Sequence, residues 1–313
     1  MVETAPTRPP DRHIRPNIGA DMKYCQLVVG PAGSGKSTYC STIVEHLGTK
    51  GRSAHVLNLD PAADTFGYKP SADVRDLVSV SDAAEELGLG PNGGLLFCME
   101  HLEENMSGWL QDVLSSFTDE DYLLLDCPGQ IELFTHLEVF RSLAKQLSEW
   151  GWTVASVFLL DSQFVTDAAK FTAGVMTSLS SMLQLETPFV NVLSKIDLLE
   201  GDRGDFERFL TPETTLLLSE LNASMPSRRR ALNDTIASIV DEYSLVNFVP
   251  LNISDEDSID EVLLQVDLCL QYGEDSEPRT MDVNEEDDSR GMPGFGSNEP
   301  PGPGEETMSL GEL

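Results

Sequence analysis

The chain has 313 residues, with 53 acidic against 20 basic side chains and a formal net charge of −33 at pH 7. This length is sufficient for a packed core in one large domain or two small ones. The excess of negative charge argues against direct binding to nucleic acid or to an anionic membrane, because both need clustered cations. We therefore expect proteins or small molecules as partners.

The sequence carries no signal for a membrane or secretory protein. No apolar run approaches the roughly 20 residues that span a bilayer, and the N-terminus lacks the apolar segment of a signal peptide. The five cysteines are isolated, without a C-x-x-C pair, at positions 25, 40, 98, 127 and 269. This pattern favours buried thiols in a reducing compartment over a zinc site, so we expect a cytoplasmic protein.

Both ends of the chain have the composition of disordered segments. Residues 1–21 are rich in proline and polar side chains, and Met22 is an alternative start site to Met1. A transit peptide is disfavoured there, because prolines and Asp11 interrupt any amphipathic helix. Residues 273–313 form an expected acidic tail, which has too little apolar surface to offset the entropy of ordering. Docking of this tail on a basic protein surface is the alternative.

Between these ends, residues 22–272 alternate short apolar runs with helical patterns. The predicted strands are residues 24–30, 54–60, 122–128, 153–161, 188–194 and 245–252. Such alternation is typical of βαβ units and predicts an α/β fold with a mostly parallel sheet and helices on both faces. Residues 201–240 break the rhythm with charged, helix-prone sequence, which predicts a helical insertion.

A phosphate-binding motif follows the first predicted strand. Residues 30–38 read GPAGSGKST and open a predicted helix, which is the context of a P-loop and makes the domain a predicted P-loop NTPase. Glycines let backbone N–H groups approach phosphate oxygens, and the helix N-terminus adds a favourable dipole. Lys36 is expected to reach the β- and γ-phosphates and Ser37 to bind Mg²⁺. The predicted nucleotide-binding residues here are Gly33, Ser34, Gly35, Lys36, Ser37 and Thr38.

A second motif, DCPGQ, ends the strand predicted at 122–128. It has the D-x-x-G arrangement of GTPases, in which Asp126 approaches the Mg²⁺ shell and the Gly129 N–H senses the γ-phosphate. Gln130 follows directly, where its amide can orient an attacking water. The alternative is that Asp126 only caps a turn.

A third motif, Ser194-Lys195-Ile196-Asp197, ends the strand predicted at 188–194. The Asp197 carboxylate can accept two hydrogen bonds from guanine, while the Lys195 stem covers the ring. Adenine offers no such paired donors, so GTP is favoured over ATP. Serine replaces the asparagine of the common N-K-x-D motif, which predicts a weaker connection to the P-loop. A surface Lys-x-Asp without function is the alternative.

The motifs together carry a resemblance to a known family. In this order and spacing, GPAGSGKST, NLDPAAD, GPNGGLLFCME, DCPGQIELFTH, LLDSQF and SKIDLL closely resemble the GPN-loop GTPases, most of all their third paralogous group. The resemblance covers residues 22–272. It implies GTP as substrate with Mg²⁺, a dimer with a paralogous GPN-loop GTPase or with itself, and a role in assembly and nuclear import of RNA polymerase II, with polymerase III as a further candidate. It also implies shuttling between cytoplasm and nucleus.

The resemblance gives roles to two further segments. The name-giving tripeptide Gly90-Pro91-Asn92 enters the partner's nucleotide site in that family, which implies that Asn92 is a catalytic donor supplied in trans. Pro91 fixes φ, and Gly90 and Gly93 are expected to make sharp turns that hold the amide out. A purely structural turn is the alternative.

The segment NLDPAAD implies that Asp60 positions the attacking water beside Gln130; a helix N-cap ahead of Pro61 is the alternative. Two other functions remain open. One is a P-loop kinase of a small metabolite or nucleoside, although the sequence has no Arg-rich lid motif. The other is a GTP-binding assembly module with negligible turnover.

Overall fold

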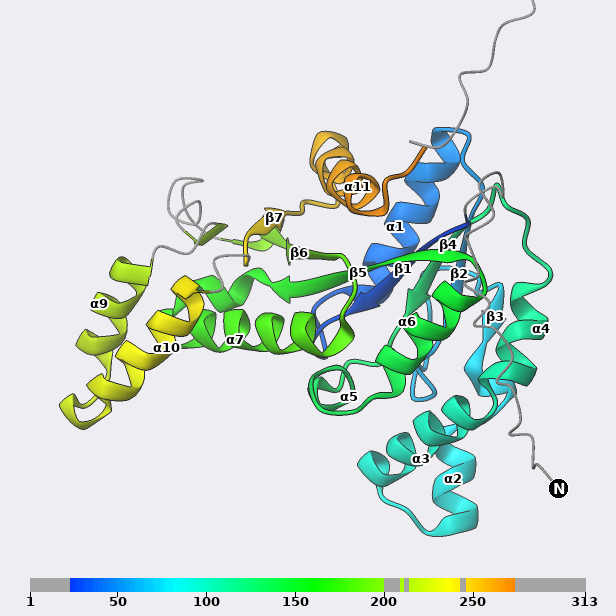
Figure 1. Cartoon of the computed structure of the whole chain (residues 1–313), viewed down its shortest axis with the longest axis horizontal. Helices are drawn as coiled ribbons and strands as arrows, with labels where there is room; N and C mark the ends of the chain where they lie inside the picture. The colour runs from blue at the N-terminus through cyan, green and yellow to red at the C-terminus, as the bar shows by residue number, and fades with distance from the viewer. Residues whose placement is uncertain (1–22, 200–208, 211–213, 243–245, 274–313) are drawn as a thin grey trace, which may run out of the picture. The chain divides into compact units, whose positions relative to one another are not determined.

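The computed structural model describes residues 23–199, 209–210, 214–242 and 246–273. Within this part of the chain, seven strands form one sheet with helices on both of its faces (Figure 1). The N-terminal extension, the acidic tail beyond Gly273 and the first residues of the expected insertion lie outside the described residues.

The strands occur close to where the apolar runs predict them. In chain order they are β1 (Lys23–Val29), β2 (Ala54–Asn58), β3 (Ala72–Asp73), β4 (Tyr122–Asp126), β5 (Trp152–Asp161), β6 (Phe189–Ser194) and β7 (Phe248–Pro250). The sheet order is β3-β2-β4-β1-β5-β6-β7, and every pair of neighbours is parallel. The predicted α/β fold with a parallel sheet is thus confirmed.

Helices connect the strands. They are α1 (Lys36–Thr49), α2 (Val80–Leu87), α3 (Pro91–Glu104), α4 (Gln111–Leu114), α5 (Ile131–Thr135), α6 (Val139–Glu149), α7 (Ala168–Leu185), α9 (Thr214–Ser224), α10 (Arg230–Glu242) and α11 (Glu256–Leu270). Short turns of 3-10 helix are η1 (Val74–Asp76), η3 (Ser162–Thr166), η4 (Ile196–Leu198) and η5 (Ser227–Arg229), and η2 (Met106–Leu110) is a π-helical turn.

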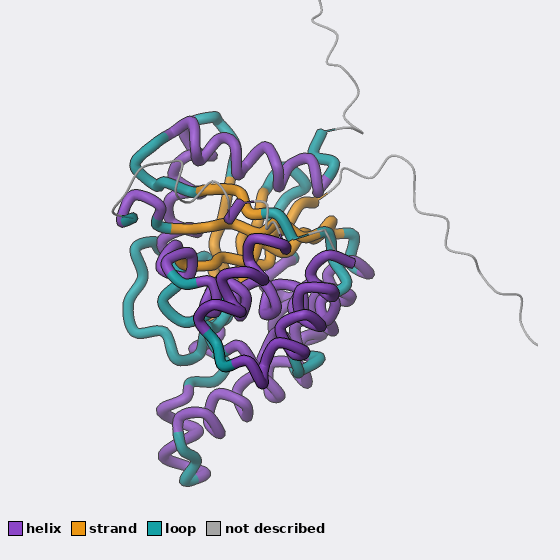
Figure 2. The backbone as a smooth tube through the Cα atoms, turned by 90° about the vertical axis from the view of Figure 1, so that its left-hand side faces the viewer, coloured by secondary structure: helices purple, strands orange, loops and turns teal. Residues whose placement is uncertain are grey.

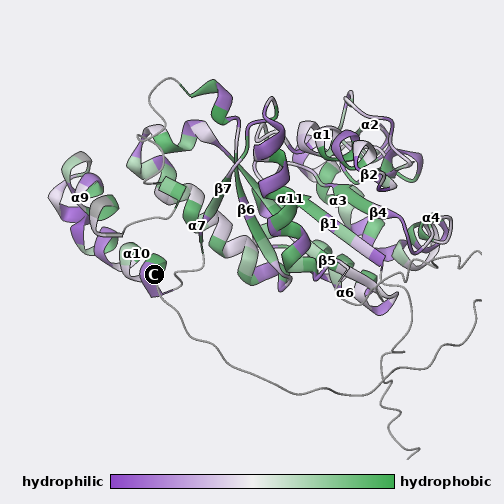
Figure 3. Ribbon diagram, turned by 90° about the horizontal axis from the view of Figure 1, so that it is seen from above, coloured by the Kyte–Doolittle hydropathy of each residue, from purple (hydrophilic) through white to green (hydrophobic). Residues whose placement is uncertain are grey.

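The sheet is covered on both sides, which explains its apolar strands. All five residues of β4 are buried, as expected for a central strand of a parallel sheet. One hydrophobic cluster joins the sheet to α1 and α11, and the other joins it to α3, α5, α6 and α7. Figure 2 shows the strands between helical layers, and Figure 3 shows their apolar character.

β1 lies at the point where the strand order reverses. The chain passes β4 to reach β2, and the later strands β5, β6 and β7 extend the sheet on the other side of β1. In open α/β sheets, ligands bind in the crevice beyond the carboxyl ends of the strands at such a reversal. The P-loop leaves β1 there, and the DCPGQ segment leaves the neighbouring strand β4.

The described part of the expected insertion is helical. Helices α9 and α10 pack against each other, and α9 also contacts α7; Figure 1 shows them at the β6–β7 side of the sheet. None of the helices in the described residues has both the length and the apolar character needed to cross a bilayer.

The cysteines do not gather into a set of metal ligands in the described residues. Four of them are buried and Cys269 is half-buried, all as free thiols. The described residues hold no group of three or more His, Cys, Asp or Glu side chains suited to a metal.

Candidate nucleotide-binding site

The P-loop backbone needs glycine at its bends. Gly30, Gly33 and Gly35 have φ values of 146°, 79° and 92°, which side chains rarely adopt. A Cβ at Gly30 would lie 2.4 Å from the Leu159 carbonyl oxygen. Helix α1 begins at Lys36 without a side-chain cap and without an acidic residue in its first turn. Its first N–H groups are therefore available to an anion.

Two side chains inside the loop suit a phosphate group. Lys36 is buried, and its Nζ donates to the carbonyl oxygens of Gly30 at 3.0 Å and Pro31 at 3.1 Å. Burial lowers the pKa of Lys36, although the charge of Asp126 opposes the shift. The buried Ser34 hydroxyl makes no hydrogen bond with the described residues. Such a group is costly unless it is paired, and a phosphate oxygen would pair it.

The DCPGQ segment lies beside the P-loop, as its position after β4 predicts. Asp126 is only 2% exposed, and burial raises the pKa of its carboxyl group, which the hydroxyls of Tyr68 and Ser37 partly offset. Gly129 packs on the P-loop so closely that a Cβ there would lie 2.8 Å from the Ala32 Cα. The Ser37 hydroxyl and the Asp126 carboxylate are oxygen donors of the kind that Mg²⁺ prefers beside nucleotide phosphates.

Asp60 follows β2 and faces the same group of charges. Burial raises the pKa of its carboxyl group; the charge of Lys36 lowers the pKa and that of Asp126 raises it. The carboxylate accepts a hydrogen bond from the Ala62 N–H at 2.9 Å. Asp60 thus caps a turn, but no helix begins there, so the N-cap alternative does not hold.

The GPN tripeptide begins a helix. Gly90 is the N-cap of α3, Pro91 is its first residue and Asn92 its second, which suits proline because the first helical N–H needs no partner. The sharp turns expected at Gly90 and Gly93 are wrong: Gly90 has φ −71°, and Gly93 lies inside the helix. The positive φ of this segment is at Gly88, which ends α2.

Asn92 is exposed beside the site of its own chain. Its Oδ1 accepts a long hydrogen bond of 3.5 Å from Gln130 Nε2. The sequence did not predict this contact, and it brings the GPN segment to the DCPGQ segment within one subunit. Insertion of Asn92 into a partner's site stays a prediction.

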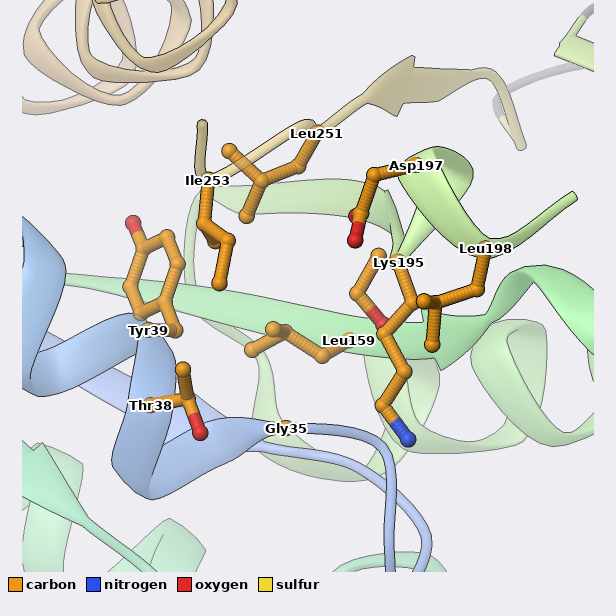
Figure 4. Close-up of a pocket in the computed structure, with 10 residues that line it drawn as sticks. Gly35, Thr38, Tyr39, Leu159, Lys195, Asp197, Leu198, Leu251 and Ile253 are labelled. Atoms are coloured by element: carbon orange, nitrogen blue, oxygen red, sulfur yellow. The ribbon is translucent and has the colours of Figure 1, made fainter. Parts of the chain in front are cut away.

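The SKID motif lines a cavity next to the P-loop. The cavity has a volume of about 210 Å³, and Lys195 and Asp197 border it together with apolar side chains from α1, β5 and the segment after β7 (Figure 4). Its lining residues are Gly35, Thr38, Tyr39, Leu159, Ser194, Lys195, Asp197, Leu198, Leu251 and Ile253. A planar nucleobase, which has apolar faces and a polar edge, would fit this lining.

Ser194 connects this cavity to the phosphate loop. Its buried hydroxyl donates to the Ser34 carbonyl oxygen at 2.7 Å and contacts the Leu160 carbonyl at 3.2 Å. The serine therefore makes the connection that the sequence predicted to be weak. Lys195 Nζ adds hydrogen bonds to the Gly33 carbonyl and to Asp161 Oδ2, the latter at 2.7 Å.

Sequence reasoning missed several contributors to the site. Asp161, at the end of β5, holds Lys195. Asn58 holds the segment after β2 by donating to the Asp60 carbonyl at 3.0 Å and to Asp73 Oδ1 at 2.8 Å. Asp161 could have been found from its place at a strand end within LLDSQF, whereas the contacts of Asn58 depend on β3, a strand too short to give a pattern.

Comparison with known proteins agrees with this geometry. A family model described as "Conserved hypothetical ATP binding protein" matches residues 28–272. The GPN-loop GTPase 3 of Dictyostelium discoideum is 48% identical over 259 residues, covering 82% of this chain and 90% of that protein. The GPN-loop GTPase 3 of Mycosarcoma maydis is 44% identical over 268 residues, covering 82% and 95%. The chain belongs to the GPN-loop GTPase family.

A solved structure supports the fold of this GPN-loop GTPase. A GTPase of Pyrococcus abyssi, crystallised in its apo form, has a TM-score of 0.64 and 25% identity, covering 79% of this chain and 96% of that protein. The predicted P-loop NTPase fold and the resemblance to the third paralogous group are confirmed.

Proposed function

We propose that this GPN-loop GTPase, which hydrolyses GTP, does so with Mg²⁺ at the P-loop site and as a dimer. The observation that carries the proposal is that the DCPGQ and SKID segments both contact the P-loop. The P-loop contacts the DCPGQ segment through Gly129 and contacts the SKID segment through Ser194. A phosphate cradle, a metal-binding carboxylate and a base pocket are therefore adjacent.

The base pocket favours guanine. Asp197 offers two carboxylate oxygens that match the paired N–H donors of guanine, and adenine lacks that pair. The description of the matching family model names ATP, whereas the relatives at 44% and 48% identity are named GTPases. The acidic edge of the pocket supports GTP.

The phosphates would lie against the loop and the start of α1. Lys36 would bind the β- and γ-phosphates, and the Ser34 hydroxyl would gain the partner that it lacks among the described residues. Ser37 and Asp126 would hold Mg²⁺, which would neutralise charge on the phosphate oxygens. The N–H of Gly129 would face the γ-phosphate.

Asp60 and Gln130 would place the attacking water. Phosphoryl transfer depends mainly on positioning and charge stabilisation, so a carboxylate of low basicity is sufficient. Asn92 would complete the site of the partner subunit as an uncharged donor. The exposure of Asn92 supports this role, because an exposed amide is accessible to a second subunit.

Exposed apolar side chains near the GPN tripeptide and Gln130 in the sequence support a dimer interface. Leu87 at the end of α2 is 52% exposed, Leu96 in α3 is 38% exposed and Ile131 at the start of α5 is 40% exposed. These residues flank the GPN tripeptide and Gln130 in the sequence. Apolar side chains grouped on a surface are typical of interaction sites, and the partner would be a copy of this chain or a paralogous GPN-loop GTPase.

Phosphate release measured with GTP and with ATP tests the activity. We expect release from GTP that does not need an added acceptor, and a large loss of rate in Gln130→Leu and Asp60→Ala. Acceptor-dependent transfer from ATP would instead support a small-molecule kinase. Slow hydrolysis that neither substitution changes would support an assembly module with negligible turnover.

The cellular role that we propose is assembly and nuclear import of RNA polymerase II, and of polymerase III as a further client. The family resemblance supports this role, together with an acidic chain suited to protein partners rather than to nucleic acid or membranes. The protein would act in the cytoplasm and shuttle to the nucleus. Depletion in its native cell should retain polymerase subunits in the cytoplasm; unchanged nuclear polymerase would contradict the proposal.

A further inference from the structure

A tyrosine outside every motif reaches the metal-binding carboxylate. Tyr68 lies in the segment between β2 and β3, and its hydroxyl donates to Asp126 Oδ2 at 2.6 Å. The acceptor is almost fully buried, and Tyr68 is half-buried. A short hydrogen bond to an ionised acceptor is among the stronger ones in proteins. The Ser37 hydroxyl interacts with the same carboxylate, so the two hydroxyls restrict its orientation together.

The ring of Tyr68 is itself held in place. The Phe66 ring stacks on the Tyr68 ring, with the two centroids 5.1 Å apart. The Arg75 guanidinium in turn lies 4.7 Å from the centroid of the Phe66 ring. The neighbouring Gly67 carbonyl accepts from Ser41 of α1 at 3.2 Å. The hydroxyl of Tyr68 is therefore presented by a supported backbone.

The same arginine fastens the residues that follow Asp60. Arg75 Nη1 donates to the Ala63 carbonyl at 2.8 Å, and its other nitrogens pair with the Asp73 carboxylate at 2.6 to 3.0 Å. Contacts thus run from Asp126 through Tyr68, the Phe66 ring and Arg75 to Ala63, next to the turn that Asp60 caps. They join the two acidic groups of the site by a path outside the P-loop.

We propose that Tyr68 is a positioning residue, which orients the Asp126 carboxylate for Mg²⁺ and couples the metal site to the segment after Asp60. The inference rests on the proposed role of Asp126. An aspartate rotates freely about its last bond unless hydrogen bonds fix it, and partners that orient a metal ligand commonly change metal affinity by about 10 to 100-fold. Residues 61–71 have no regular secondary structure apart from turns, so their order depends on attachments of this kind.

The test compares Tyr68→Phe with Tyr24→Phe in the full chain. Tyr24 is a matched control, because it is also half-buried and its hydroxyl accepts a hydrogen bond from Gly273 N rather than from the site. Release of a fluorescent GDP is measured against Mg²⁺ concentration. We expect the Mg²⁺ midpoint of Tyr68→Phe to rise about tenfold, with faster amide exchange in residues 61–71, and that of Tyr24→Phe to stay unchanged.

The outcomes separate the inference from the proposed function. A Tyr68→Phe midpoint within about twofold of the wild type would overturn the role of Tyr68. Release that is independent of Mg²⁺ in the wild type would instead contradict the proposed metal site. Phe66→Leu keeps the hydroxyl and removes the stacked ring, so it should raise the midpoint less than Tyr68→Phe. An equal or larger rise would also overturn the inference, because the hydroxyl would not carry the effect. Thermal unfolding checks that each variant is folded.

Discussion

Replacement of Gly129 by alanine tests the contact between the DCPGQ segment and the P-loop. The added Cβ would lie 2.8 Å from the Ala32 Cα, 3.0 Å from the Ala32 nitrogen and 3.0 Å from Lys36 Nζ. Two of these neighbours are backbone atoms of the phosphate loop, so the clash cannot be relieved by rotating a side chain. Either the loop or the segment after β4 must move.

The size of the effect follows from the cost of overpacking. Extra methyl groups in closely packed sites typically cost about 1 to 3 kcal/mol. If this cost falls on the nucleotide-bound state, GTP affinity decreases by about 5 to 150-fold. The loss should be larger for GTP than for GDP, because the Gly129 N–H is expected to face the γ-phosphate.

Titration with fluorescent GTP and GDP analogues measures the effect, and Gly108→Ala is the control. A Cβ at Gly108 meets no atom within 4 Å, so the same substitution there should leave affinity unchanged. Thermal unfolding separates a local change from loss of the fold. If Gly129→Ala bound GTP as tightly as Gly108→Ala, the inferred packing of this segment on the phosphate loop would be refuted.

Three further substitutions test separate parts of the account. Ser194→Ala leaves the Ser34 carbonyl without its donor and should weaken GDP binding by about 5 to 10-fold in calorimetry; unchanged affinity would show that this bond does not support the loop. Burial raises the pKa of Asp60, so the hydrolysis rate should fall on acidification at a pH above the ordinary aspartate pKa of 3.8. Asp60→Asn should lack this fall in rate at low pH. If the fall persisted in Asp60→Asn, another group would be responsible for it. Burial raises the pKa of Asp121, but hydrogen bonds from Ser53 and Thr118 lower it to about 2. Asp121→Asn should therefore reduce the free energy of unfolding in urea by about 1 kcal/mol at pH 7, after solvent screening. This cost should vanish as pH falls from about 4 to 2. A cost independent of pH would argue against this ionised, hydrogen-bonded state.

Motifs at strand ends were the part of the site that the sequence could predict. The P-loop, Asp126 and the SKID segment lie at the carboxyl ends of β1, β4 and β6, and carboxyl ends of parallel strands meet at one edge of a sheet. Apolar runs located these strands to within a few residues. The strand β3 was not predicted, because its two residues, Ala72 and Asp73, are too few to show the alternation of apolar and polar side chains that marks a strand.

Contacts between segments were beyond sequence reasoning. Tyr68 and Asp126 are 58 residues apart in the sequence, and Ser194 and its P-loop acceptor Ser34 are 160 residues apart. Contacts between residues so far apart in the sequence depend on how the layers of the fold pack. The helical start at Pro91 did have a local signal, since proline is favoured at the first helical position. The two nearby glycines favoured a turn instead, and this interpretation was wrong.

Mixing two inactive variants tests the donation of Asn92 between subunits most directly. Lys36→Ala removes the phosphate-binding cation but keeps Asn92, and Asn92→Ala keeps an intact phosphate loop. In a mixed dimer purified through two different tags, one site would have both its own Lys36 and the partner's amide. GTP hydrolysis should recover to about half of the wild-type rate, since one of two symmetric sites is complete. A mixed dimer as inactive as both parent variants would contradict the account.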